Sequence, residues 1–281
     1  MTNRNVHIEN HLNCKIIYEK EIGGGCIAQT SVISMSNGKN YFLKTGFKGS
    51  MFSCEANGLK ELQKAKAIRI PELILHADDF LLLEHIESGK KKPSFYKQFG
   101  EQLAKVHQVK NDAFGFFENN YIGSNPQINS YRSNWIDFYF ENRLMPQYRL
   151  AENNGYCDHD FSTAFKSIES QLTKILNDSE EAPCLLHGDL WGGNYLVDIH
   201  GNPVLIDPAV YYGHREADLA MTKLFGGFDN VFYQSYHQTY PLKEGYLYRE
   251  NIYLLYHVLN HLNLFGTSYK QQALALMRSY Q

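Results

Sequence analysis

Two aspartates and one asparagine bracket a predicted β-hairpin in the last third of the chain. Asp189 is followed by Asn194 five positions later, and Asp207 ends the next apolar run. Apolar triplets flank the polar, glycine-containing stretch 198–202, and this pattern predicts two strands joined by a short loop. The hairpin returns Asp207 to the neighbourhood of Asn194. The fold of this chain therefore has to bring three oxygen-bearing side chains together.

These three side chains are the groups that phosphoryl transfer from ATP requires. A carboxylate must lie beside the attacking hydroxyl, and an amide and a second carboxylate must hold magnesium on the phosphates. Asp189 is the candidate base, and Asn194 and Asp207 are the candidate magnesium ligands. The Asp-x-x-x-x-Asn spacing equals that of the kinase catalytic loop, although Gly188 precedes the aspartate in place of arginine. A chance His-Gly-Asp tripeptide is the alternative, and the offsets of Asn194 and Asp207 argue against it.

The composition narrows the class of protein. The chain has 281 residues, enough for one large domain or two modest lobes. Its formal net charge is −3, so it lacks the basic surplus of a nucleic-acid binder. Five scattered cysteines without a Cys-x-x-Cys pair favour a reducing compartment. The chain shows neither the apolar core of a signal peptide nor a run long enough to span a membrane, so we expect a cytoplasmic protein.

The first third of the chain carries mostly strand signals. Apolar runs at 15–18, 30–35 and 41–44 predict strands, and Asn37-Gly38 predicts a tight hairpin between the last two.

A glycine triplet lies between the first two of these strands. Glycine lets backbone N–H groups approach a phosphate because no Cβ intervenes. An ordinary loop is the alternative, and the Walker pattern is absent. The candidate nucleotide-binding residues of this segment are Gly23, Gly24, Gly25 and Ile27, with Cys26 between them.

Lys44 ends an apolar strand, a position from which a lysine can reach the phosphates of ATP. A surface lysine at a strand end is the alternative. Glu55 is its candidate partner, because it follows Phe52 by three positions in a predicted helix and can point the same way. An ion pair between Lys44 and Glu55 would hold the lysine ready for phosphate.

A second hairpin and a linker mark the boundary between two lobes. Apolar runs at 72–77 and 80–86 predict the hairpin, and the polar stretch 87–93 predicts the linker. In a two-lobed nucleotide site the backbone of such a linker would face adenine; the family resemblance given below implies that Glu84, His85 and Ile86 do so here.

The period of the apolar residues becomes helical after Pro93. Helical patterns cover 94–108, 135–144, 161–176, 215–225, 231–240 and most of 245–280. A strand-rich first third and a helical remainder predict an α+β protein of two lobes with a cleft between them. We expect a nucleotide-binding lobe at residues 1–88 and a catalytic and acceptor-binding lobe at residues 89–281.

Together these motifs resemble the protein-kinase-like superfamily, and in particular its fructosamine kinase (ketosamine kinase) branch. The most specific segments are 187–194 and 206–221, and 122–127 and 225–228 add to them. Aminoglycoside and choline kinases share the bare His-Gly-Asp and the later aspartate. The Leu-Trp extension after Asp189 and the Tyr-Gly-His extension ending at His214 favour the ketosamine branch.

The resemblance implies a two-lobed protein-kinase-like fold, with a small N-terminal antiparallel-sheet lobe containing one main helix and a larger, mostly helical C-terminal lobe. It implies an ATP- and magnesium-dependent kinase for the 3-hydroxyl of ketosamines, free or on protein lysines, with a role in protein deglycation. In this reading Trp191 and His214 contact the sugar acceptor, and Asp218 braces the catalytic loop. Cys26 would allow a redox-dependent homodimer of an otherwise monomeric protein, with a packing role under the loop as the alternative.

Other functions remain open from the sequence. Another small-molecule kinase of the aminoglycoside or choline type would share the catalytic residues and differ in the acceptor wall. A non-catalytic binding module would lack one of the four polar residues Lys44, Asp189, Asn194 and Asp207, and all four are present. His257 and His261 lie four apart on a predicted helix. Because the glutamate of the His-Glu-x-x-His zinc motif is missing, we expect them to pack the helix rather than bind metal.

Overall fold

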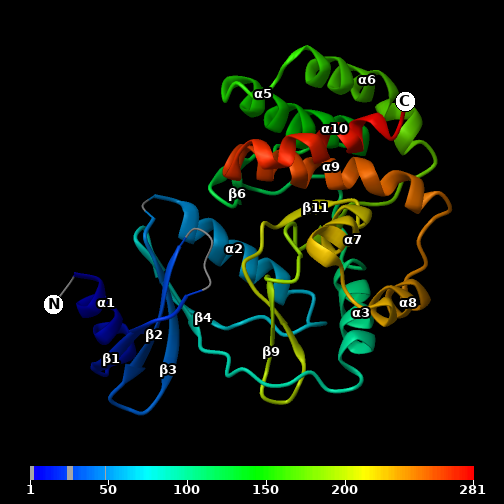
Figure 1. Cartoon of the computed structure of the whole chain (residues 1–281). Helices are drawn as coiled ribbons and strands as arrows, with labels where there is room; N and C mark the ends of the chain where they lie inside the picture. The colour runs from blue at the N-terminus through cyan, green and yellow to red at the C-terminus, as the bar shows by residue number, and fades with distance from the viewer. Residues whose placement is uncertain (1–2, 24–27, 48) are drawn as a thin grey trace.

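The computed structural model describes residues 3–23, 28–47 and 49–281, and within these ranges it has two lobes of different composition (Figure 1). The N-terminal lobe holds a five-stranded antiparallel sheet in the order β1-β2-β3-β5-β4. Its strands are β1 (Ile16–Glu21), β2 (Gln29–Met35), β3 (Asn40–Thr45), β4 (Leu73–Ala77) and β5 (Phe80–Glu84), and its helices are α1 (Asn3–Leu12) and α2 (Met51–Gln63).

The sheet forms because alternate side chains of its strands enter a small core. Along β2, Ile33 and Met35 are fully buried while their neighbours are partly exposed, as the period of a strand requires. Gly38 has a φ of 81°, which the predicted Asn-Gly hairpin between β2 and β3 needs. Ile8 of α1 is fully buried in the same core. The sequence analysis missed α1, because its ten residues are mostly polar.

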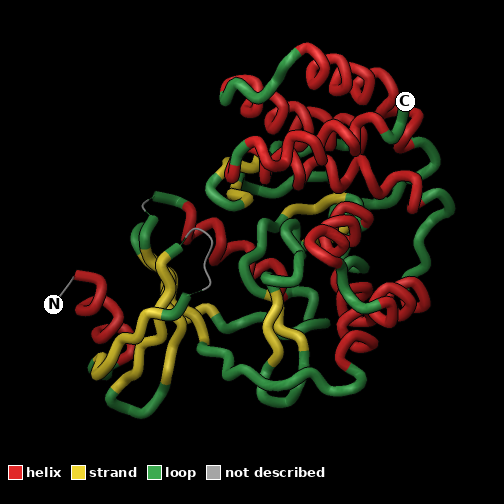
Figure 2. The backbone as a smooth tube through the Cα atoms, in the orientation of Figure 1, coloured by secondary structure: helices red, strands yellow, loops and turns green. Residues whose placement is uncertain are grey.

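The C-terminal lobe is mostly helical (Figure 2). Its α-helices are α3 (Phe95–Val106), α4 (Trp135–Tyr139), α5 (Met145–Asn153), α6 (His159–Leu176), α7 (Glu216–Lys223), α8 (Asn230–Thr239), α9 (Tyr246–Phe265) and α10 (Lys270–Arg278), with a π-helix at Phe140–Leu144 after α4. Short turns of 3-10 helix follow α7 and α9, at Leu224–Gly226 and Thr267–Tyr269. The predicted two-lobed α+β arrangement is confirmed, whereas the exact boundary at residues 88 and 89 stays a prediction.

The C-terminal part of the chain also holds three short antiparallel strand pairs. They are β6 (Asn120–Ile122) with β7 (Asn125–Gln127), β8 (Cys184–Leu186) with β11 (Tyr211–Gly213), and β9 (Tyr195–Val197) with β10 (Pro203–Leu205). The β9–β10 pair is the hairpin predicted from the sequence. The other two pairs were not predicted, because strands of three residues are too short to show a period.

The interlobe linker is attached to the β9–β10 hairpin. The Gly89 N–H donates to the Val197 carbonyl over 2.9 Å, and Ser88 forms a β-bridge with Asp198. A Cβ on Gly89 would lie 2.1 Å from the Asp198 carbonyl oxygen, so only glycine fits this approach.

In the described part of the chain, no helix combines the length and the apolar character needed to cross a membrane.

Helices α3 and α8 pack side by side through a glycine (Figure 1). A Cβ on Gly100 of α3 would lie 2.2 Å from the Phe232 carbonyl oxygen and 3.0 Å from the Tyr236 amide nitrogen. The backbones of the two helices are therefore as close as they can be.

Replacing this glycine tests the close approach. We expect Gly100→Ala to lower the free energy of unfolding by about 2 kcal/mol despite the better helix propensity of alanine, because overpacking against backbone cannot be relieved by a rotamer change. Urea unfolding measures the change. Gly58→Ala in α2 is the control, since its Cβ would meet side chains and no backbone, with Val210 at 3.3 Å and Pro208 at 3.5 Å. Equal stabilities of the two variants would contradict the close approach.

Candidate active site

A cavity of about 760 Å³ lies between the two lobes and collects most of the predicted site residues. The sheet lobe contributes residues of β2, β3, α2 and the linker, and the helical lobe contributes the catalytic stretch and the end of α9. The predicted residues that line the cavity are Gly23, Lys44, Glu55, Glu84, His85, Ile86, Asp189, Trp191, Asn194 and Asp207. Gly24, Gly25, Cys26 and Ile27 lie outside the described residues.

Lys44 joins the two lobes at the cavity floor. Its ammonium donates to Oε1 of Glu55 over 2.7 Å and to Oδ1 of Asp207 over 2.6 Å. Burial by itself lowers the pKa of Lys44, but the charges of Asp207 and Glu55 outweigh it and raise the pKa above its ordinary value. Burial raises the pKa of Glu55, and the charge of Lys44 opposes this. The expected Lys44–Glu55 ion pair is therefore present, and Asp207 shares it.

Asp189 and Asn194 are held to each other across the catalytic loop. The Asn194 side-chain amide donates to the Asp189 backbone carbonyl over 2.8 Å and to its Oδ2 over 3.1 Å. Burial, followed by the charge of Asp207, raises the pKa of Asp189 to about 7. Asp189, Asn194 and Asp207 thus face one cavity, and the carboxylates of Asp189 and Asp207 can attract a cation.

The backbone before Asp189 is fixed by a buried carboxylate. Asp218 of α7 accepts hydrogen bonds from the His187 N–H over 2.7 Å and from the Gly188 N–H over 2.8 Å. Nε2 of His107 lies 3.2 Å from the same carboxylate. Burial would raise the pKa of Asp218, but the hydrogen bonds from His107 and the Gly188 amide lower it. Asp218 therefore anchors the catalytic loop to the helical lobe.

The catalytic loop and the Asp207 segment are in direct backbone contact. Gly188 has a φ of 85°, and a Cβ at this position would lie 1.9 Å from the Ala209 carbonyl oxygen. The Ala209 N–H donates to the His187 carbonyl over 2.9 Å. Asp207 itself has a φ of 55°, a conformation that costs a non-glycine residue free energy and that clusters at functional sites. Glycine replaces the kinase arginine here because no side chain fits.

The linker residues lie at the edge of the cavity, with the Glu84 side chain directed elsewhere. The Glu84 carboxylate accepts a hydrogen bond from Arg69 over 2.6 Å, and the same guanidinium donates to Asp198 over 2.8 Å. Arg69 thus connects the end of β5 to the β9–β10 turn. Glu84, His85 and Ile86 line the cavity where β5 passes into the linker, and the Glu84 N–H is already bound to the Glu72 carbonyl over 2.9 Å.

Aromatic side chains form the wall of the cavity opposite the sheet lobe. The Trp191 ring packs edge-on against Phe225 at 5.6 Å between centroids, and Phe225 packs against His261 at 5.0 Å. Phe225 is half exposed and has a φ of 60°, so its backbone is strained where its ring meets the cavity. We call the cavity-lining residues Trp191, Phe225, His261, Phe265 and Tyr269 the aromatic wall.

His261 is a site residue that the sequence analysis missed. Nδ1 of His261 lies 2.7 Å from the His257 carbonyl oxygen, one helical turn earlier, and the residue lines the cavity. His257 is buried behind it. The available signal was the spacing of His257 and His261 on a predicted helix, but this spacing does not say which side of the helix faces the cavity.

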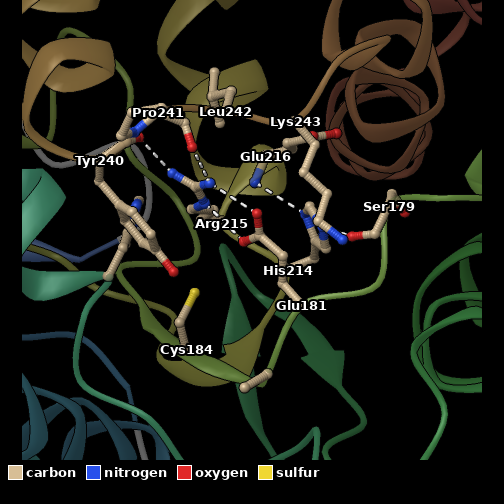
Figure 3. Close-up of polar contacts among 12 residues, drawn as sticks. Ser179, Glu181, Cys184, His214, Arg215, Glu216, Tyr240, Pro241, Leu242 and Lys243 are labelled. Carbon is tan, nitrogen blue, oxygen red and sulfur yellow. Dashed lines mark hydrogen bonds and ion pairs between the residues drawn. The ribbon is translucent and has the colours of Figure 1, made fainter.

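The structure places His214 away from the cavity, in contrast to the expectation that it contacts the acceptor. Its side chain is 1% exposed and stacks on Tyr253, with Trp135 nearby. Nε2 donates to the Ser179 carbonyl over 2.7 Å, and Nδ1 accepts from the Glu216 N–H over 3.3 Å (Figure 3). Both ring nitrogens are used inside the helical lobe, so His214 supports the start of α7.

The neighbouring Arg215 explains why this corner faces inward. Its guanidinium binds both carboxylate oxygens of Glu181 at 2.7 Å and donates to the carbonyls of Tyr240 and Pro241 (Figure 3). Its Cζ lies 3.6 Å from the centroid of the Tyr240 ring. These contacts point the corner between β11 and α7 into the core and direct Asp218, one turn later, at the catalytic loop.

Comparison with known proteins agrees with this geometry. The family model for fructosamine kinase matches residues 1–281. A probable ketoamine kinase from Synechocystis is 38% identical over 94% of this chain and 90% of that protein. A chloroplastic protein-ribulosamine 3-kinase from Arabidopsis thaliana is 37% identical over 92% of this chain and 81% of that protein.

Solved structures show the same architecture. A crystal structure of a putative fructosamine-3-kinase from Thermobifida fusca has a TM-score of 0.90 at 30% identity, covering 99% of this chain and 98% of that one. An aminoglycoside phosphotransferase solved with streptomycin and ATP has a TM-score of 0.64 at 16% identity, covering 100% of this chain and 98% of that one, and shares the fold. By sequence over its full length and by structure, the chain belongs to the fructosamine kinase family.

Proposed function

We propose that this protein is an ATP-dependent kinase that phosphorylates the 3-hydroxyl of ketosamines, the adducts of sugars on amines, including those on protein lysines. The observation that carries the proposal is the convergence of Lys44, Asp189, Asn194 and Asp207 on one cavity bounded by the aromatic wall. Family membership supports the substrate class, since two of its relatives are named as a probable ketoamine kinase and a protein-ribulosamine 3-kinase.

Magnesium fits the donor set of the site. Asn194 uses its side-chain N–H₂ group on Asp189, which leaves its side-chain oxygen for a cation. Asp207 provides the carboxylate, and oxygen ligands of this kind suit magnesium. When bound, magnesium would neutralise charge that develops on the transferred phosphoryl group. Lys44 would contribute a second positive charge on the phosphate side.

Asp189 is placed to orient the acceptor hydroxyl and to accept its proton. A carboxylate with a moderate pKa is sufficient, because phosphoryl transfer requires little base strength. Asn194 holds the Asp189 carboxylate in one orientation, and Asp218 holds the backbone that carries it. Most of the rate acceleration then comes from positioning and from the charges around the phosphates.

The aromatic wall supports an amine-linked acceptor. Trp191 and Phe225 offer apolar faces to a sugar ring and to the alkyl stem of a lysine, and aromatic faces attract an ammonium group. Of the described residues that line the cavity, Lys44 alone is a lysine or arginine, and it is bound to Glu55 and Asp207. The described wall thus offers no lysine or arginine to the carboxylate of a free amino-acid adduct, which favours adducts on protein lysines.

The proposal includes a deglycation-type repair role in a cytoplasmic setting. The described cysteines Cys14, Cys54, Cys157 and Cys184 are free, which is compatible with a reducing compartment. A monomeric state and a redox-dependent homodimer through Cys26 remain predictions.

Removing the proposed base tests the mechanism. We expect Asp189→Asn to lower kcat on the order of a thousand-fold, because the variant loses proton acceptance and the orientation of the hydroxyl together. Its affinity for ATP should stay near that of the wild type, since Lys44 and the linker are unchanged. Steady-state kinetics and calorimetric ATP titration measure the two quantities. Turnover close to the wild-type rate would remove Asp189 from the role.

The same variant has a distinct stability signature. Because burial raises the Asp189 pKa from 3.8 to about 7, the folded state binds this proton more tightly than the unfolded state, and the free energy of unfolding falls as pH rises between these values. Relative to the wild type, Asp189→Asn should therefore gain stability from pH 5 to pH 8 in urea unfolding without ligands.

The variant Asp218→Asn should change the pH dependence of the free energy of unfolding in the opposite direction. The Asp218 pKa is lowered, so its carboxylate stabilises the fold above pH 3.8 and loses that effect as the pH falls. We expect Asp218→Asn to be less stable than the wild type at pH 8. A stability difference between Asp189→Asn and the wild type that stays constant from pH 5 to pH 8 would show that Asp189 does not have a raised pKa.

A panel of acceptors tests the substrate class. We expect magnesium-dependent ATP consumption with ribulosyl-lysine and fructosyl-lysine carried in a peptide, and none with choline or kanamycin. Trp191→Ala should raise KM for the peptide roughly ten-fold with little change in KM for ATP, because it removes one face of the aromatic wall. Phosphorylation of choline or kanamycin in preference to the sugar adducts would favour another small-molecule kinase.

A further inference from the structure

A buried cluster of side-chain amides lies directly behind the Asp207 segment. Its members come from the β6–β7 hairpin and the residues after it, within the segment 120–129 that overlaps the motif 122–127, to which the sequence analysis gave no role. Asn120, Gln127 and Asn129 are each at most 5% exposed. We call these three residues the amide cluster.

The amide cluster donates hydrogen bonds to the backbone carbonyls of Ala209 and Val210, the two residues after Pro208. The Gln127 amide donates to the Ala209 carbonyl over 3.0 Å, and the Asn120 amide donates to the Val210 carbonyl over 2.8 Å. The Ala209 N–H is already bound to the His187 carbonyl. Ala209 is therefore fixed on both sides, by the catalytic loop through its N–H and by Gln127 through its C=O.

Anchoring Ala209 constrains Asp207, which lies only two residues away. Pro208 stands between them, and its ring restricts φ to a narrow range. Asp207 has a positive φ, which persists only where the surroundings hold it. A short and stiff segment thus transmits the position of the Ala209 carbonyl to the carboxylate of Asp207.

Arg143 sets the direction of every hydrogen bond in the cluster. It is fully buried, and its guanidinium lies 3.9 Å from the Tyr211 ring centroid. Because arginine can only donate, the bond of 2.8 Å to Asn129 Oδ1 forces the Asn129 amide group toward Asn120 Oδ1. The amide of Asn120 must then face the Val210 carbonyl.

Gln127 is the last member of this series of hydrogen bonds. Its amide group donates to Asn120 Oδ1 over 2.8 Å as well as to the Ala209 carbonyl, and its Oε1 accepts from the Tyr256 hydroxyl over 2.8 Å. Both N–H bonds and the carbonyl oxygen of the Gln127 side chain are used. Because the Gln127 side chain is fully bonded, this buried arrangement is costly to leave incomplete.

The hairpin also reaches the aromatic wall. The Asn125 amide donates to Asn260 Oδ1 over 2.8 Å, and Asn260 precedes His261 on α9 (Figure 1 shows β6 beside α9). The hairpin that holds the Asp207 segment is thereby attached to the acceptor side of the cavity.

We propose that Gln127 is a positioning residue for Asp207, acting through the Ala209 carbonyl with the amide cluster behind it. The inference rests on the proposed role of Asp207 as a cation ligand. Gln127 does not line the cavity, so its effect on catalysis passes through the Asp207 segment.

The test is the near-isosteric variant Gln127→Met, which keeps volume and removes both donors. Calorimetric titration with a non-hydrolysable ATP analogue, in EDTA and in magnesium, separates metal-dependent from metal-independent affinity. We expect unchanged affinity in EDTA and a magnesium-dependent gain reduced on the order of ten-fold, the usual loss when a partner of a metal ligand is removed. The magnesium concentration for half-maximal turnover should rise by a similar factor.

Two further variants keep the test decisive. Asn142→Leu removes a different buried amide, whose bond of 2.8 Å goes to the Ser130 carbonyl, and should leave the magnesium-dependent gain unchanged. Tyr256→Phe removes only the hydroxyl bound to Gln127 Oε1 and should give a smaller shift in the same direction, even where Gln127→Met folds poorly.

The outcomes separate the two proposals. A normal magnesium-dependent gain in Gln127→Met and Tyr256→Phe, with lowered thermal stability alone, would overturn the positioning role and leave the proposed function intact. A wild-type protein without any magnesium-dependent gain would overturn the cation role of Asp207 and this inference with it.

Discussion

Direct backbone contact between the catalytic loop and the Asp207 segment is the constraint on which the site depends. Gly188 permits the contact because it has no side chain, and Ala209 completes it through its N–H. Asp218 holds the loop from one side, and the amide cluster holds the Asp207 segment from the other. The two acidic groups of the site are thereby placed by main-chain atoms whose partners lie in the helical lobe, so their separation does not depend on flexible side chains.

The part of the fold and of the site that follows local patterns could be predicted from the sequence. The Asn-Gly turn and the β9–β10 hairpin follow from local turn residues and short apolar runs. The long helices follow from the helical spacing of their apolar residues. The convergence of Asp189, Asn194 and Asp207 followed from one hairpin, because its geometry is local. The Lys44–Glu55 pair needed only a strand end and a helix face.

What sequence reasoning missed depends on packing between distant segments. His214 lies beside conspicuous motifs, yet Ser179 and Tyr253 enclose it, and no local pattern reports which way a strand-to-helix corner turns. His261 shows the reverse case: the sequence predicted that it packs within the helical lobe, and the structure places it at the cavity. Gly58 lies in the interior of α2, where propensity argues against it, because Val210 and Pro208 press on that side of the helix.

The shared ion pair of Lys44 has a thermodynamic consequence. Without ligands, the ammonium neutralises Asp207, and a cation that takes Asp207 has to displace it. The displaced ammonium is then free for phosphate oxygens, so the metal and the nucleotide each make room for the other. In the proposed mechanism their binding would therefore be heterotropically cooperative, and by reciprocity each ligand would raise the affinity for the other by the same factor.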